Sequence, residues 1–160
     1  MQIRKATLAD VPAMTEIFNW AIRETTFVFR KVEATVAERE EHFRSVEGYP
    51  YLVVETDRVM GFALLQPHND PRRWDGCFED SIYIDPAGHG QGLGKHLLSA
   101  LVEEARQDER IHTVLALICG NNPASVALHE KLGFKKSGYL RELSFKHGQW
   151  LDLNYLQLMV

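Results

Sequence analysis

The segment from Gly88 to Lys95 has the composition of an anion-binding turn. Gly88, Gly90, Gly92 and Gly94 alternate with other residues, and glycine lets a backbone approach a ligand closely. The apolar residues that follow have helical spacing: Leu97, Leu98, Leu101, Val102 and Ala105. The first N–H groups of a helix have no carbonyl partner within it, and the helix dipole is positive there. The turn could therefore hold a phosphate or pyrophosphate, although such a turn can also be a purely structural cap.

Two common phosphate-binding motifs do not fit this segment. A Walker loop would need glycine at His89 and serine or threonine at His96. A dinucleotide-binding Gly-x-Gly-x-x-Gly would place its last glycine at Leu93, Lys95 or Leu97. The pattern that does fit is a strand, then x-x-Gly-x-Gly, then a long helix.

Two segments resemble motifs of the GNAT superfamily of N-acetyltransferases. His89-Gly-Gln-Gly-Leu-Gly94 is similar to the family's coenzyme A loop, Gln/Arg-x-x-Gly-x-Gly, with histidine at the first position. Asn122-Pro-Ala-Ser-Val-Ala-Leu-His-Glu-Lys-Leu-Gly-Phe134 is similar to the later motif, Asn-x-x-Ser-x-x-x-Tyr/His-x-x-x-Gly-Phe. The resemblance implies an α/β (α+β) GNAT fold, in which helices flank a central, twisted, mixed and mostly antiparallel sheet.

The resemblance also implies acetyl-CoA as the co-substrate. Its pyrophosphate would be held by Gly90, Gln91, Gly92, Leu93, Gly94 and Lys95, although Lys95 can equally be a solvated lysine of the first helical turn. Backbone groups of Ile82, Tyr83 and Ile84 would pair with the pantetheine arm, as an extended ligand adding to a sheet edge requires. One of their N–H groups would also stabilise the oxyanion. The later motif implies that Asn122 contacts the pantetheine arm and that Ser125 lies near the coenzyme.

Direct acetyl transfer to an amine needs a base, because an ammonium group must lose a proton before it can attack. Glu79, at the start of the strand before the loop, is the candidate, acting directly or through a water. The alternative is a solvated carboxylate at a strand end. His129 matches the Tyr/His position of the later motif, which implies that it donates a proton to the departing thiolate or holds the water that does. A histidine on a core-facing helix can also be a satisfied structural residue.

Further segments resemble one branch of the superfamily, the phosphinothricin and methionine sulfone or sulfoximine N-acetyltransferases. The resemblance covers nearly the whole chain. The segments that carry it are Asn19-x-x-Ile22 with Thr25-Thr26, Gly48-Tyr-Pro50, Glu79-Asp-Ser-Ile-Tyr-Ile84, Phe145-Lys-His-Gly-Gln-Trp150-x-Asp152 and Leu156-Gln-Leu158. This branch implies a small amino acid-like amine as the acceptor, and it implies a homodimer.

An amino acid substrate needs a cationic partner for its carboxylate. Arg72 and Arg73 lie in the polar loop before Glu79, and arginine binds such oxygens through two parallel hydrogen bonds. The branch has basic residues in this loop as well, one or two positions from Arg72, so surface arginines are an equal alternative. Other candidates for the pocket wall, which could instead belong to the core, are Phe27, Phe29, Trp74 and Lys146.

These residues must be positioned by alternating helices and strands. We expect strands at 2–5, 51–56, 59–65, 78–84 and 112–118, with a hairpin turn at Asp57-Arg58. Helices are expected from Thr7, with an apolar stripe from Val11 to Ile22, over 36–47, after the glycine turn, and over 123–132. A polar loop spans 66–76, and two long strands turn at His147-Gly148 to complete one domain, residues 1–160.

The composition restricts the partners. The 160 residues carry 18 basic and 22 acidic side chains, a formal net charge of -4, so nucleic acid is not expected as the main partner. No apolar run approaches the ~18 residues of a membrane span, and the first residues lack the apolar stretch of a signal peptide.

The two cysteines, Cys77 and Cys119, are predicted to be reduced, buried thiols. No histidines have metal-ligand spacing. We therefore expect a cytoplasmic protein that needs no metal.

Two alternatives to the amino acid N-acetyltransferase remain open. The first is an enzyme of the same superfamily that acetylates a polyamine, an aminoglycoside or a protein N-terminus. A polycationic acceptor favours an acidic pocket, whereas the loop before Glu79 contains both arginine and aspartate. The second is a non-catalytic module that binds acyl-CoA, which would need neither Glu79 nor His129.

Overall fold

A single seven-stranded sheet runs through the molecule. The computed structural model describes residues 1–70 and 72–160. The strands are β1 (Gln2–Lys5), β2 (Tyr51–Glu55), β3 (Val59–Pro67), β4 (Cys77–Ile84), β5 (Thr113–Cys119), β6 (Lys135–Lys146) and β7 (Gln149–Met159). Their order in the sheet is β1-β2-β3-β4-β5-β7-β6. Only β4 and β5 pair in parallel within the described chain, so the predicted mixed, mostly antiparallel sheet is confirmed.

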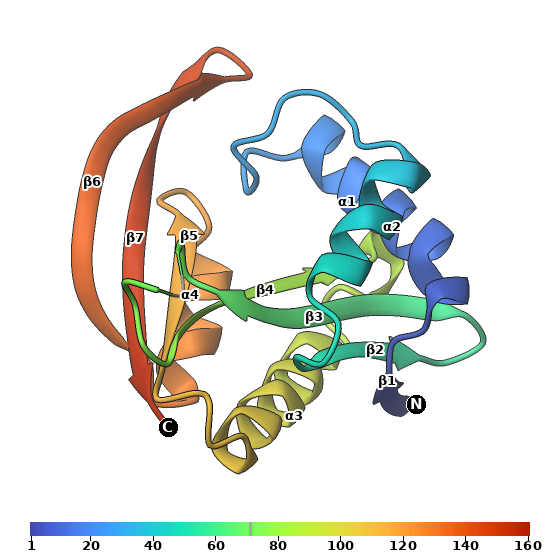
Figure 1. The fold of residues 1–160 in the computed structure, drawn as a ribbon. Coiled ribbons are helices and arrows are strands. Elements are labelled where there is room, and N and C mark those ends of the chain that lie inside the picture. The colour runs from blue at the N-terminus through green and yellow to red at the C-terminus, as the bar shows by residue number, and fades with distance from the viewer. Residues whose placement is uncertain (71) are drawn as a thin grey trace.

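Helices cover both faces of this sheet. They are α1 (Val11–Glu24), α2 (Val36–Ser45), α3 (Leu93–Gln107) and α4 (Pro123–Lys131), with short 3₁₀ turns at Leu8–Asp10 and Pro86–Gly88. The first two helices pack together above β3 and β4, whereas α3 crosses below the same strands (Figure 1). The long β6–β7 hairpin arches away from the rest of the molecule. This arrangement places the end of α3 that carries the glycine turn close to the carboxyl end of β4.

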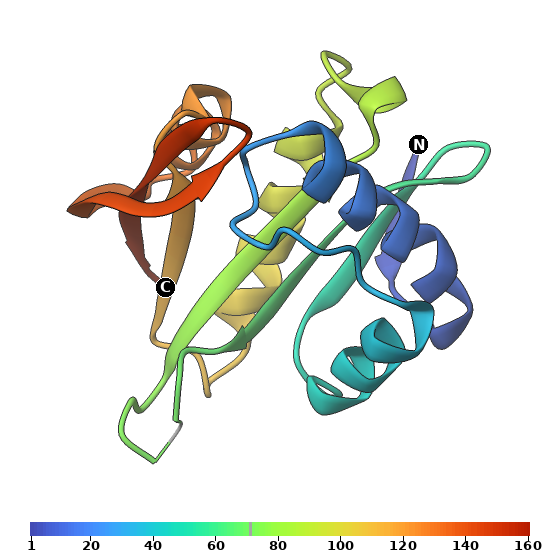
Figure 2. The same cartoon turned by 90° about the horizontal axis from the view of Figure 1, so that it is seen from above.

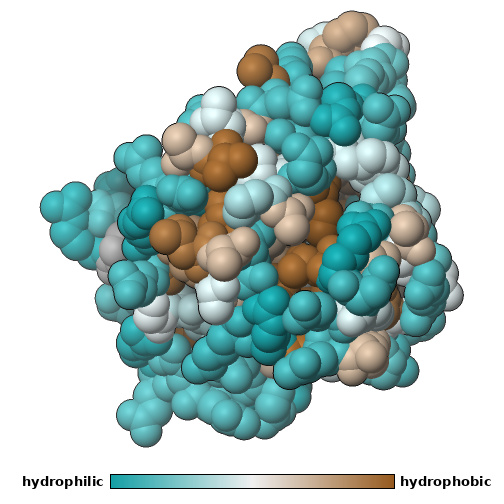
Figure 3. Space-filling view, turned by 90° about the vertical axis from the view of Figure 1, so that its right-hand side faces the viewer, coloured by the Kyte–Doolittle hydropathy of each residue, from teal (hydrophilic) through white to brown (hydrophobic). Residues whose placement is uncertain are grey.

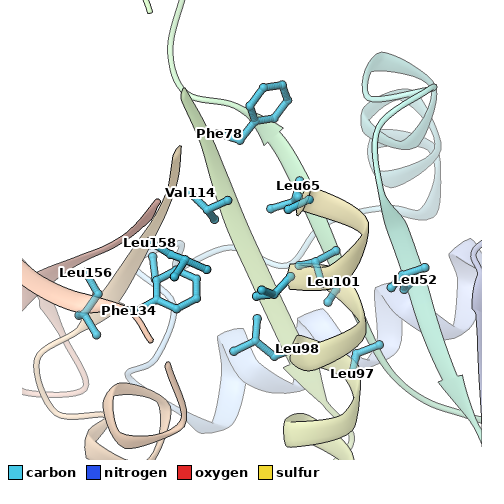
Figure 4. Packing of buried hydrophobic residues seen from close by; sticks show 14 of the residues in the cluster. Leu52, Leu65, Phe78, Leu97, Leu98, Leu101, Val114, Phe134, Leu156 and Leu158 are labelled. Atoms are coloured by element: carbon cyan, nitrogen blue, oxygen red, sulfur yellow. The ribbon is translucent and has the colours of Figure 1, made fainter. Parts of the chain in front are cut away.

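The larger apolar core lies between α3 and the sheet. Leu97, Leu98 and Leu101 of α3 are 1% exposed or less. They point towards side chains from several strands, which include Leu52, Leu65, Phe78 and Val114 (Figure 4). The helical spacing predicted after the glycine turn is therefore confirmed, because this stripe faces the core.

A second core lies on the other face, beneath α1. The buried apolar side chains of α1 are those predicted from the sequence: Val11, Met14, Ile17, Phe18, Ala21 and Ile22. They pack against β2 and β3, and the Tyr83 ring from β4 joins them. Tyr83 stacks on Phe62 with ring centroids 5.0 Å apart. Burial raises the pKa of Tyr83 to about 12, so its phenol stays neutral and serves as core.

Some expected element limits are wrong. Thr7 caps the first helical segment through a capping box with Asp10, as predicted, but the residues Leu8–Asp10 form a 3₁₀ turn and the α-helix itself begins at Val11. The second helix ends at Ser45. The third strand continues through Pro67, since Gln66 and Pro67 pair with β4. The predicted polar loop therefore starts at His68, and its Pro71 lies outside the described residues.

The surface shows how the polar residues are distributed. The face on the right-hand side of Figure 1 is mostly hydrophilic, with hydrophobic residues gathered towards its centre (Figure 3). None of the helices described in residues 1–70 and 72–160 is long and apolar enough to cross a membrane.

Candidate functional site

A cleft of about 810 Å³ opens where β4 and β5 separate. Figure 2 shows the two strands meeting near one end and diverging towards the other. The cleft is lined by Asp80–Ile84 of β4, the glycine turn and first turn of α3, Leu117–Cys119 of β5 and one side of α4. The end of α1 and Phe27 contribute the remaining wall. Both motifs singled out in the sequence therefore reach the same cavity.

The divergence leaves backbone groups of β4 free for a ligand. On the β5 side, β4 pairs only from Cys77 to Glu79, whereas on the β3 side it stays paired as far as Ile84. From Asp80 to Ile84, the edge that faces β5 consequently has no strand partner within the described residues. Such an edge can pair with an extended ligand, as a missing strand would.

The glycine turn directs backbone N–H groups towards the cleft. Asp85 accepts a hydrogen bond from the N–H of Ala87 at 2.8 Å and starts the turn. Gly90 and Gly92 adopt φ angles of 76° and 77°, a left-handed conformation that glycine adopts without strain. The first α-helical hydrogen bond of α3 runs from the N–H of His96 to the Gly92 carbonyl. The preceding N–H groups lack a helical acceptor, so the turn can bind an anion.

The structure gives His89 and Gln91 local roles. The Nε2 atom of His89 lies 3.1 Å from the carbonyl oxygen of Ile84, to which it donates. The ring of His89 also packs edge-on against Trp20. The Gln91 side chain donates to the Ala87 carbonyl at 2.7 Å. Both side chains therefore hold the turn, which leaves its backbone amides as the groups that could bind an anion.

The start of α4 lies on the opposite wall. The Asn122 side-chain oxygen accepts a hydrogen bond from the N–H of Ser125 at 3.2 Å and caps the helix, as asparagine does at many helix starts. Both residues line the cleft. One turn later His129 lies beneath them, with 1% of its surface exposed.

His129 forms a buried ion pair with Asp80. The Nε2 atom of His129 lies 2.9 Å from Oδ2 of Asp80, and its Nδ1 atom lies 2.7 Å from the carbonyl oxygen of Ser125. Burial alone would lower the pKa of His129, but the hydrogen bond and charge of Asp80 together with the Ser125 carbonyl outweigh it and raise that pKa. The pair with Asp80 therefore favours the protonated form of His129.

Glu79 lies at the apex of the diverging strands, on the other face of β4. Its register partners are Gln66 of β3 and Leu115 of β5. The Oε1 atom of Glu79 makes a short hydrogen bond with Nδ1 of His68. The other ring nitrogen of His68 is 2.7 Å from the Asn69 side-chain amide, and the ring packs against Trp74. Glu79 is not among the residues that line the cleft; it lies next to them in the strand.

The predicted arginines lie away from the cleft. The side chain of Arg72 is 88% exposed and pairs with Asp70 of its own loop. Arg73 is exposed as well, and Trp74 is half exposed against His68. None of the three lines the cleft. In the described part of the chain, no group of His, Cys, Asp or Glu side chains has an arrangement suited to a metal ion.

The loop after α1 crosses towards the β6–β7 hairpin. Lys146 is 6% exposed, and its Nζ atom donates to the carbonyl of Val28 at 2.8 Å. Burial lowers the pKa of this lysine. Phe27, the neighbour of Val28, lines the cleft, whereas Phe29 and Lys146 do not. Lys146 thus contacts the loop that carries Phe27, at the residue next to it.

Three residues of the site had no role in the sequence analysis: Trp20, His68 and Asp80. Asp80 and Glu79 are consecutive on β4, so their side chains leave the strand on opposite faces. The sequence alone gave no sign that Asp80 would meet a histidine 49 positions away. The alternation along β4 does indicate that the Asp80 side chain faces the core. A buried aspartate needs a hydrogen-bonding partner, although the alternation does not say which residue that is.

Comparison with known proteins identifies the family to which the chain is similar. The sequence profile of the acetyltransferase (GNAT) family matches residues 14–134. An L-methionine sulfoximine/L-methionine sulfone acetyltransferase from Pseudomonas aeruginosa is 37% identical over 160 residues, which cover 98% of this chain and 92% of that protein.

Two solved structures have the same fold over almost their whole length. A phosphinothricin acetyltransferase from Sinorhizobium meliloti, in complex with acetyl-CoA, superposes with a TM-score of 0.94 at 32% identity, covering 99% of this chain and 88% of that one. A ribosomal-protein-alanine N-acetyltransferase from Brucella melitensis gives a TM-score of 0.93 at 34% identity, covering 100% of both chains.

The ion pair of His129 makes a prediction about stability. In the unfolded chain the imidazole has its ordinary pKa of about 6.5, and folding raises it. The stabilisation that protonated His129 provides is therefore complete below the unfolded pKa and is lost as the pH rises through the folded pKa. In urea unfolding from about pH 5 to about pH 9, the free-energy difference between the wild type and His129→Gln should shrink as the pH rises. A difference that stays constant or grows would contradict a charged His129.

Proposed function

Since the chain belongs to the GNAT acetyltransferase family, we propose that it transfers the acetyl group of acetyl-CoA to the primary amine of a small amino acid-like molecule. Methionine sulfone, methionine sulfoximine and phosphinothricin represent the proposed substrate class. One observation carries the proposal: the free edge of β4 and the amino end of α3 face the same cleft. The relatives with substrates of this class support the choice of acceptor.

The cleft offers complementary groups to each part of acetyl-CoA. Backbone N–H groups between Gly90 and Lys95 would hold the pyrophosphate, so no surplus of lysines is needed. Backbone groups of Ile82–Ile84 would pair with the amides of the pantetheine arm, opposite Asn122 and Ser125. An N–H group of this edge that points at the thioester oxygen would stabilise the oxyanion by roughly 3 kcal/mol.

Glu79 would act as the base, directly or through a water. It takes one proton from the substrate ammonium, and the freed amine attacks the thioester carbon. The nitrogen then loses its second proton to solvent as the carbon–sulfur bond breaks with its electron pair on sulfur. His129 supplies a proton to this thiolate and leaves coenzyme A as a thiol. The hydrogen bond from His68 orients the Glu79 carboxylate, which supports the assignment because a base must be held within reach of its proton.

Lys146 is the candidate partner for the substrate carboxylate. It is a buried amine whose hydrogen bond goes to the Val28 carbonyl, next to Phe27, which lines the cleft. Phe27 and Phe29 belong to the same loop and would shape the acceptor pocket. Arg72, Arg73 and Trp74 would contribute only if their loop folded towards the cleft, so we give Lys146 the main role.

A second acceptor class is a protein N-terminus. This class is retained as an alternative because the structure is similar to that of a ribosomal-protein-alanine N-acetyltransferase, at 34% identity. An α-amino group of a peptide has the same chemistry as that of an amino acid, but it lacks the adjacent free carboxylate. The choice between the two therefore depends on whether the site recognises that carboxylate.

We also propose that the protein is a homodimer. The β6–β7 hairpin exposes large apolar side chains, namely Tyr139, Leu140, Leu143, Phe145 and Trp150, and β6 is the last strand of the sheet. Exposed apolar patches next to an open strand edge are typical of protein interfaces. A monomer in sedimentation equilibrium at micromolar concentration would overturn this assignment.

The cellular setting proposed here is the cytoplasm. Cys77 and Cys119 are both buried and free, which suits a reducing compartment. Acetylation would remove the positive charge of a toxic amino acid analogue, so detoxification is the proposed role. Finding the native protein outside the cytoplasmic fraction of its cells would contradict the location.

A panel of amines tests the acceptor class directly. Thiol release from acetyl-CoA is measured with methionine sulfone, methionine sulfoximine, phosphinothricin, spermidine, an aminoglycoside and an alanine-terminated peptide. The proposal predicts that kcat/KM is highest for one of the first three. Highest activity with the peptide would favour the second class, and thiol release with none of them despite tight acetyl-CoA binding would favour a non-catalytic module.

Glu79→Gln should depress turnover most at low pH. Most substrate amine is protonated there, so removal of the base costs roughly 10² to 10⁴-fold, and the loss should shrink as the amine deprotonates by itself. Glutamine keeps an oxygen that can accept from His68. Glu109→Gln, at an exposed position, makes the same change in charge and should behave as the wild type. Wild-type turnover of Glu79→Gln across the pH range would exclude Glu79 as the base.

A further inference from the structure

Asp80 and His129 form a buried pair in the wall of the cleft, and the family motifs give Asp80 no role. The side chains of His129 and Asp80 are 2% and 4% exposed, and Nε2 lies 2.9 Å from Oδ2. Asp80 belongs to β4 and His129 to α4, and their contact joins these two walls of the cavity. Both line the cleft, so the pair lies within reach of a bound ligand.

The hydrogen bonds of His129 define its protonation. Nδ1 faces the carbonyl of Ser125 and Nε2 faces the carboxylate of Asp80. Neither a carbonyl oxygen nor a carboxylate can donate, so both ring nitrogens must carry hydrogen, which only the imidazolium does. In an apolar site an imidazolium without a counter-ion would lose its proton.

Among the described residues, Asp80 is the one charged group that acts on this ring. The other neighbours are neutral. Ser125 contributes its carbonyl from one turn earlier in α4, and Phe134 packs edge-on against the ring at 5.0 Å between centroids. The charge state of His129 therefore depends on a single side chain, since nothing else around it would offset the burial.

We propose that Asp80 is a positioning residue for acetyl transfer, which holds His129 as an imidazolium through the hydrogen bond to Nε2, so that a protonated ring lies in the wall of the cleft. The proposal rests on the proposed function, in which His129 serves the thiolate of coenzyme A. Without Asp80, burial would favour the neutral form of His129. It could then accept a hydrogen bond at Nε2 but could not supply a proton from that atom.

The proton balance of the step is complete. The carbon–sulfur bond breaks with its electron pair on sulfur, and the proton on Nε2 of His129 moves to that sulfur. The imidazole that remains keeps its proton on Nδ1, bonded to Ser125, and places a lone pair beside the Asp80 carboxylate. Because this arrangement is unfavourable, His129 takes up a proton from solvent, while Glu79 releases to solvent the proton it removed from the ammonium. The nitrogen loses its second proton to solvent as the amide forms, so each turnover releases one proton in net.

Asp80→Asn tests the proposal with little change in shape. The asparagine amide can donate to a neutral Nε2, so the hydrogen bond survives while the charge is lost. We expect the pKa of His129, followed by NMR of its ring nitrogens, to fall below that of the wild type. The basic limb of the pH profile of kcat should move to lower pH by the same amount, with kcat at about pH 8 reduced on the order of 10²-fold. The KM for acetyl-CoA should change little.

Two controls separate charge from structure. Asp108→Asn removes one negative charge at the far end of α3, where Asp108 pairs with Arg110, and it should leave both the His129 titration and the kcat profile as in the wild type. Asp80→Glu restores the carboxylate and should recover most of the shift. The ring-nitrogen shifts of the wild type itself report whether His129 is doubly protonated at neutral pH, and this holds even if a variant fails to fold.

The outcomes distinguish this proposal from the proposed function. A singly protonated His129 in the wild type at neutral pH, or an unchanged titration in Asp80→Asn, would overturn the role of Asp80. A shifted titration with an unshifted kcat profile would overturn it as well. If His129→Gln kept the wild-type rate, the acid role of His129 would fail in the proposed function itself. If His129→Gln lost activity and Asp80→Asn did not, only the proposed role of Asp80 would be overturned, and the acid role of His129 would stand.

Discussion

The separation of β4 from β5 after Glu79 is the constraint on which the rest of the structure depends. Three paired positions hold the strands together, and beyond them β4 stays bonded to β3 while β5 stays bonded to β7. A backbone edge left free in this way must be satisfied by water or by a ligand. Below the sheet, Leu97, Leu98 and Leu101 of α3 belong to the same apolar core as Phe78 and Val114, which pair where the two strands are still joined. The cleft is therefore a consequence of strand pairing.

The alternation of side chains along β4 places two different charge systems next to the apex of that cleft. Glu79 leaves one face and is held by His68, whereas Asp80 leaves the other and is held by His129. A single strand thus separates the carboxylate that we propose as the base from the histidine that we propose as the acid. The same alternation sends the Tyr83 ring into the core under α1 and leaves its backbone for the cleft. Consecutive residues can consequently serve packing and chemistry at once.

Much of this site could be predicted from the sequence, because its main determinants are local. The turn from Gly88 to Gly94 needs glycine wherever φ is positive, and the cap at Asn122 is read from the residues around it. Apolar periodicity gave the buried faces of α1 and α3 for the same reason. What could not be predicted are contacts between distant segments, such as Asp80 with His129, or Lys146 with Val28. Arg72 shows the opposite limit, since its loop position suggested a substrate contact while its own Asp70 holds it in solvent.

The central claim is that the free edge of β4 and the amino end of α3 together bind acetyl-CoA. Hydrogen exchange of the backbone amides, followed by mass spectrometry with and without saturating acetyl-CoA, tests it most directly. The account predicts slower exchange in Asp80–Ile84 and in Gly90–Lys95, with little change in β1 or β2. Saturating binding that leaves both segments unprotected, or that protects only regions outside the cleft, would contradict it.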